Sequence, residues 1–146
     1  MSTMTGASWR CHRTPVMEGF VTQSLDGKPL SCLMGDIKEW DSGTLRTTVF
    51  PNFWQHASDD HAVASRITPV SATECRVDSH WLVHKDAVEG VDYDLETLTH
   101  VWQATNEQDG ALVGRAQRGV RDPGYVPGPY SPFTERYLDL FATWYL

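Results

Sequence analysis

The sequence predicts an α+β fold, in which an antiparallel sheet comes first and helices afterwards pack across it. Segments rich in Val, Thr, Ile and aromatic residues, separated by turn residues, fill the part before Glu89-Gly90, and a helical periodicity follows. The 146 residues are 40% hydrophobic and 21% charged, which suits one globular domain. We expect strands over residues 1–90, a long helix over 91–121, and a loop with a terminal helix over 122–146.

Five segments of the first part have strand character. Their β-branched and aromatic side chains favour a pleated sheet, and turn signals such as Asp-Gly and Asp-Ser-Gly separate them. The segments are Gly19–Ser24, Pro29–Met34, Thr44–Phe50, Ala62–Pro69 and Glu74–His84. They predict an antiparallel meander.

The long helix is expected to begin at Leu95, with Asp92 or Asp94 as its N-cap. Apolar residues recur along it at three- and four-residue spacing, which indicates one buried face. Gly119 and the proline that follows it end the helix. A short last helix is expected from about Thr134, after a loop rich in Pro and Gly.

One carboxylate lies on the apolar face of this helix. At about 100° per residue, Asp109 projects within about 20° of Trp102. Burial of an ionised carboxylate is costly unless a cation, a metal ion or several donors compensate it. A structural ion pair and a metal ligand or catalytic acid both fit this position. Asn106, one turn before, and Gln117, two turns after, extend the polar notch.

The charge pattern disfavours two classes of partner. The formal net charge is -7 and the basic residues are scattered, which argues against nucleic acid. No apolar run approaches the roughly 20 residues of a membrane span. The three cysteines are widely spaced, as is usual in a reducing compartment. We expect a cytoplasmic protein that binds neither nucleic acid nor membranes.

Ordered motifs run through the chain at consistent spacing. They are Gly19–Pro29, Phe50–Trp54, Asp60–Pro69, the run Trp102-Gln-Ala-Thr-Asn-Glu-Gln-Asp109, and Tyr125–Ser131. Together they resemble the end of the catalytic domain of Rieske-type non-haem iron oxygenase α-subunits. The most similar branch acts on quaternary amines and includes glycine betaine demethylase, choline monooxygenase and carnitine monooxygenase.

The resemblance implies a helix-grip fold of the START and Bet v 1 type, incomplete at its amino-terminal end. It also implies that the long helix carries the carboxylate of a facial triad of two His and one Asp or Glu that holds Fe(II), and the matching position is Asp109. Neither the family's two iron-binding His nor the paired Cys and His of its [2Fe–2S] Rieske cluster has a match in this sequence.

We therefore expect a partial catalytic domain that is active only with a separately encoded amino-terminal oxygenase part, which brings the cluster and the two His, and with a reductase or ferredoxin. The family implies trimers. The expected reaction is O₂ activation at Fe(II) for hydroxylation or N-demethylation of a small substrate such as a quaternary amine. Two alternatives stay open: a non-catalytic helix-grip module that binds a small ligand, and an inactive truncated fragment.

Four histidines and one glycine need separate interpretation. His56 and His61 have the five-residue step of the family's ligand pair, but they lie in a different segment, and we interpret them as structural. His80 and His84 alternate along one predicted strand, where a pocket role and a solvent-facing role are both open. Gly110 follows the candidate ligand, where similar family members commonly have a bulky residue.

Overall fold

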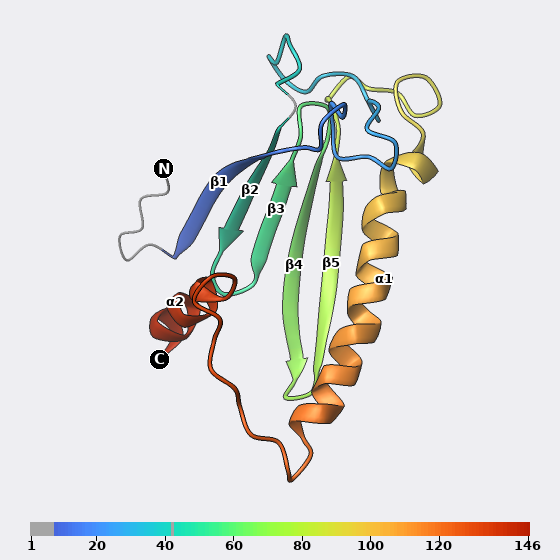
Figure 1. The fold of residues 1–146 in the computed structure, drawn as a ribbon. Coiled ribbons are helices and arrows are strands. Elements are labelled where there is room, and N and C mark those ends of the chain that lie inside the picture. Colours follow the sequence, from blue (N-terminus) through green and yellow to red (C-terminus); the bar gives the residue numbers. More distant parts are fainter. Residues whose placement is uncertain (1–7, 42) are drawn as a thin grey trace.

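One antiparallel sheet forms the centre of the computed structural model, which describes residues 8–41 and 43–146. Its strands are β1 (Trp9–Pro15), β2 (Gly43–Val49), β3 (Phe53–Ala57), β4 (Ala62–Ser71) and β5 (Glu74–Leu82). Each strand pairs with the next one in the sequence. Figure 1 shows the two helices at different places: α1 (Leu95–Val120) runs beside β5, and α2 (Arg136–Tyr145) lies near the β2–β3 turn. The predicted α+β class is confirmed.

The predicted meander of five strands is present, but two of the observed strands are not the ones that the sequence predicted. The sequence predicted β2, β4 and β5 and missed β1 and β3. The strands predicted over Gly19–Ser24 and Pro29–Met34 are wrong, since both segments are bends in the irregular connection between β1 and β2. The backbone N–H of Leu30 donates to the Asp60 carboxylate at 2.7 Å and that of Met34 to the Asp59 carbonyl at 2.8 Å, so these donors serve tertiary contacts instead of a strand ladder.

A fully buried carboxylate, Asp60, anchors this connection to the β3–β4 turn. It accepts hydrogen bonds from the Thr22 hydroxyl at 2.6 Å, from His61 Nδ1 at 2.8 Å and from the Leu30 backbone. Burial by itself raises the pKa of Asp60, but hydrogen bonds and the nearby His61 ring lower it by more, so its net pKa is below the ordinary value. Asp60 and His61 are therefore part of the framework.

Local capping sets the start of α1. The Asp94 side chain accepts a hydrogen bond from the Thr97 backbone N–H at 2.8 Å, which confirms the second of the two predicted N-caps. The helix ends at Val120, one residue before the expected end of the helical segment. The last helix, α2, starts two residues later than predicted, and its Phe141 packs edge-on against Phe50 at 5.2 Å between ring centroids.

Only the first half of α1 is packed against the sheet. Its buried residues are Leu98, Thr99 and Trp102. Further along, Leu112 and Val113 are each 59% exposed. Neither described helix combines the length and the hydrophobicity that a bilayer crossing requires.

Candidate functional site

The face of the sheet that α1 covers carries the candidate site. Trp102 lies over two side chains of β3, with its ring centroid 5.0 Å from that of Trp54 and 4.8 Å from that of His56. One turn further, Asn106 Nδ2 donates to Ser79 Oγ on β5 at 3.5 Å. Because side chains alternate along a strand, Trp54, His56 and Ser79 define one face, and the alternate residues of the other strands share it.

Asp109 lies one turn beyond Asn106, and it is exposed. The prediction that the sheet buries Asp109 is therefore wrong for this chain. α1 runs along the edge strand β5 (Figure 1), but none of its buried residues lies beyond Trp102, so the side chains of its second half are not packed on the sheet. Asn106, which the sequence placed in the same polar notch as Asp109, donates to Ser79.

The surroundings of Asp109 are open. Among the described residues, Asp109 has no hydrogen-bond or ion-pair partner, and a Cβ added at Gly110 would meet no atom within 4 Å. Gln117 is partly buried two turns further along α1, whereas Glu107 is exposed. The carboxylate is thus free to bind a cation, and there is space beside it.

The histidine pairs do not form a ligand set with Asp109. His61 is 2% exposed and hydrogen-bonded to Asp60, whereas the ring of His56 packs on Trp102. His80 is exposed on β5. The prediction that His84 shares that strand is wrong, because β5 ends at Leu82. His84 accepts a hydrogen bond from a turn N–H. Within residues 8–41 and 43–146, no three His, Cys, Asp or Glu side chains are grouped closely enough to hold a metal ion.

Basic side chains form a row across the same face of the sheet. His12 on β1 is the cross-strand neighbour of Arg46 on β2, and Arg46 is the neighbour of His56 on β3. Burial, followed by the positive charges of Arg46 and His12, lowers the pKa of His56 to about 4. The pKa of His12 is also lowered, by burial and by Arg10 and Arg46. These shifts favour the neutral form of both rings, so the positive charges of this row are those of the Arg10 and Arg46 guanidinium groups.

Arg46 is the least satisfied member of this row. Its Nε atom is buried, and within the described part of the chain Arg46 has neither a hydrogen bond nor an ion pair. Arg10, the next basic residue on this face, lies over the Tyr137 ring of α2, 3.2 Å from its centroid. The buried Nδ1 of His56 and Nε1 of Trp102 also have no partner in the described residues. Unpaired donors thus gather on one face.

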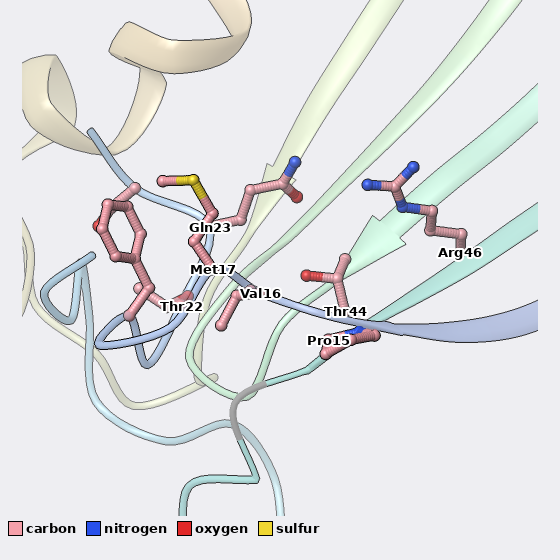
Figure 2. Close-up of a pocket in the computed structure, with 9 residues that line it drawn as sticks. Pro15, Val16, Met17, Thr22, Gln23, Thr44 and Arg46 are labelled. Atoms are coloured by element: carbon pink, nitrogen blue, oxygen red, sulfur yellow. The ribbon is translucent and has the colours of Figure 1, made fainter. Parts of the chain in front are cut away.

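A hollow of about 220 Å³ adjoins Arg46, and residues of the β1–β2 connection line its other side. Figure 2 shows the Gln23 amide and the Arg46 guanidinium extending into it from opposite sides, with Thr44 between them on β2. A second hollow, of about 290 Å³, lies between α2 and the strands β2 to β4, and Trp54 and Phe141 line it.

Sequence reasoning missed Arg46, His12 and Gln23. Arg46 lies in the middle of a predicted strand, where a charged residue is unusual, and this was the available signal. Its position beside His12 follows from the register with β1, which was not predicted as a strand. The place of Gln23 depends on the irregular connection, which was predicted as strands.

The chain is thus an α+β domain with an antiparallel sheet, a helix along one face and two open hollows on that face, one beside Arg46 and one with a mainly apolar lining under α2. The chain matches the family described as "Ring hydroxylating alpha subunit (catalytic domain)" over residues 4–146, and it belongs to this oxygenase family. It is 46% identical over 137 residues to the glycine betaine monooxygenase oxygenase subunit of Pseudomonas aeruginosa and 45% identical to that of Chromohalobacter salexigens. The match covers 93% of this chain but only 32% and 31% of these relatives, so the chain spans about a third of their length.

Proposed function

We propose that this chain is the carboxyl-terminal catalytic part of a Rieske-type oxygenase and that Asp109 is one ligand of its mononuclear Fe(II). The observation that carries the proposal is the family match over residues 4–146. The run from Trp102 to Asp109, which resembles the ligand motif of this family, supports Asp109 as the metal-binding carboxylate. The open surroundings of this carboxylate support the role. Iron bound there would supply O₂ activation, for hydroxylation or N-demethylation of a small substrate such as a quaternary amine.

Asp109 fits iron as one donor of a shared site. A facial triad needs two imidazoles besides the carboxylate, and no group of three metal-binding side chains occurs in the described residues. We propose that the two His and the [2Fe–2S] Rieske cluster come from an amino-terminal oxygenase part outside these 146 residues. A reductase or ferredoxin would then deliver electrons to the cluster. The chain supplies the carboxylate, the aromatic side chains around Trp102 and much of the pocket wall.

The exposed half of α1 supports a larger assembly. Leu112 and Val113 project into solvent beyond the packed part of the helix, and apolar groups in such a position commonly mark an interface. In this proposal residues 1–146 are a partial helix-grip domain, which the amino-terminal part completes, and the completed subunits form trimers. The cytoplasmic location expected from the sequence stays a prediction.

Co-expression with the amino-terminal oxygenase part tests the iron site. We expect D109A to lose mononuclear iron and turnover while the cluster absorbance is retained. E107A is the matched control, since Glu107 is an exposed carboxylate on the same helix that projects about 160° away from Asp109. Full iron content and turnover in D109A would contradict the proposal.

A metal-free binding module is the second candidate, and the hollow beside Arg46 is the observation that favours it. This candidate predicts ligand binding that is insensitive to chelators and to D109A, together with no iron in the co-expressed complex. Iron that depends on Asp109 would exclude it.

A further inference from the structure

We infer that the hollow beside Arg46 is a subsite for the carboxylate of a small zwitterionic substrate, with Arg46 as the residue that determines this specificity. The inference rests on the proposed function, because it assumes that the hollow is part of the substrate pocket of that oxygenase. It does not depend on the ligation of iron by Asp109.

The first argument is charge. Arg46 is permanently protonated, and its buried Nε has no partner in the described residues. By strand alternation and register, the face of the sheet under α1 carries no Asp or Glu on any described strand. Arg46 is partly buried, and its buried Nε has lost water without gaining an acceptor, so an anion from outside these strands would complete this site.

The second argument is geometry. A guanidinium donates two parallel N–H groups and matches the two oxygens of a carboxylate. The Gln23 amide faces the same space from the opposite wall, and its NH₂ group supplies further donors (Figure 2). The hollow, at about 220 Å³, has room for about seven water-sized groups, which suits the end of a small molecule.

The third argument concerns the rest of the ligand. The rings of Trp54 and Trp102 lie next to the end of the basic row, with centroids 5.2 Å and 4.8 Å from that of His56, which is the cross-strand neighbour of Arg46. The face of an indole ring attracts an ammonium cation by cation–π interaction. In this proposal the ammonium group of the ligand would point from the hollow past Arg46 and His56 toward this pair of rings.

Binding to the full chain tests this subsite with two probes, glycine betaine and choline. Both carry a trimethylammonium group, and only the first carries a carboxylate. By titration calorimetry we expect the unmodified chain to bind glycine betaine more tightly than choline. R46Q should weaken glycine betaine binding by about tenfold to a hundredfold and leave choline binding unchanged.

Matched variants separate this role from a structural one. R66Q is the control, because Arg66 is exposed on β4 with its side chain on the opposite face of the sheet, and its affinities should not change. Removal of an unpaired, partly buried cation should not lower the urea midpoint, so R46Q should be at least as stable as the unmodified chain. R46K, which keeps the charge without the paired donors, should bind glycine betaine with intermediate affinity.

Several outcomes would overturn the inference. They are equal affinities of the unmodified chain for the two probes, no binding of either probe, unchanged glycine betaine binding in R46Q, and an equal loss for both probes. A destabilised R46Q would instead indicate a structural arginine. D109A should keep the binding preference even though it loses iron, so failure of the carboxylate subsite and failure of the iron site give different results.

Discussion

Replacement of Asp60 by alanine should destabilise this protein more than any surface carboxylate change. The Asp60 side chain is fully buried, and Thr22, His61 and the backbone N–H groups of Leu30 and Ser31 all donate to it. D60A would leave these four donors without their acceptor and would release the β1–β2 connection from the β3–β4 turn.

The magnitude follows from the number and kind of these bonds. A hydrogen bond to a charged group contributes about 1.5–3 kcal/mol, and each buried group left without its partner costs about 1–3 kcal/mol. The four bonds share one acceptor and are not additive, and water can enter after truncation. We therefore expect D60A to lower the free energy of unfolding by about 3–5 kcal/mol, and D60N, which keeps the shape, by about 1–3 kcal/mol.

Urea unfolding at pH 7, followed by circular dichroism, measures both values. At this pH Asp60 is ionised, since its pKa lies below the ordinary value, and its contribution is fully present. That contribution is lost only as the pH falls below about 3.8 and through the pKa of the folded state. D78A is the control, because the exposed pair of Asp78 with Arg76, at 3.0 Å, is worth at most about 1 kcal/mol. A loss in D60A no larger than in D78A would refute the anchoring role.

Three other changes test the packing and the electrostatics. Between pH 6.5 and about 4 the unfolded chain binds more protons at His56 than the folded chain does. The free energy of unfolding should therefore fall by about 1 kcal/mol, after solvent screening, as the pH drops through this window. H56Q should reduce this dependence on pH. W102A should cost about 3–5 kcal/mol in urea unfolding, because the buried ring packs on Trp54 and His56, whereas L112A should change stability by less than about 0.5 kcal/mol. D94A should cost about 1 kcal/mol through loss of the N-cap, and a melting temperature equal to that of the unmodified chain would contradict the capping role.

The parts of the fold that local patterns determine could be predicted from the sequence. The N-cap at Asp94, the apolar spacing of α1 and the hairpin of β4 and β5 depend on neighbours a few residues apart. β1 carries mostly polar residues and β3 has only five, so neither gives a strong strand signal. The β1–β2 connection was mistaken for strands because its hydrogen bonds go to Asp60, about 30 residues away in the sequence.

The site was only partly predictable for the same reason. A helical projection fixed the side of α1 on which Asp109 lies, and the structure agrees that Trp102 and Asn106 on that side meet the sheet. It could not tell whether another element covers the helix at Asp109. The role proposed for Arg46 depends on its neighbours on two other strands, His12 and His56, which the sequence alone does not bring together.

The proposed carboxylate subsite at Arg46 and the proposed iron site at Asp109 lie at opposite ends of the Trp102 contact along α1. Trp102 contacts Trp54 and His56, and Asn106 contacts Ser79, which is on the row of Trp54 and not on that of His56. The helix thus leads away from the basic row, and Asp109 lies about 10 Å beyond Trp102 along its axis. A substrate that binds Arg46 by its carboxylate and the Trp rings by its ammonium group would therefore direct its N-methyl groups toward the end of the pocket where Asp109 is proposed to hold iron.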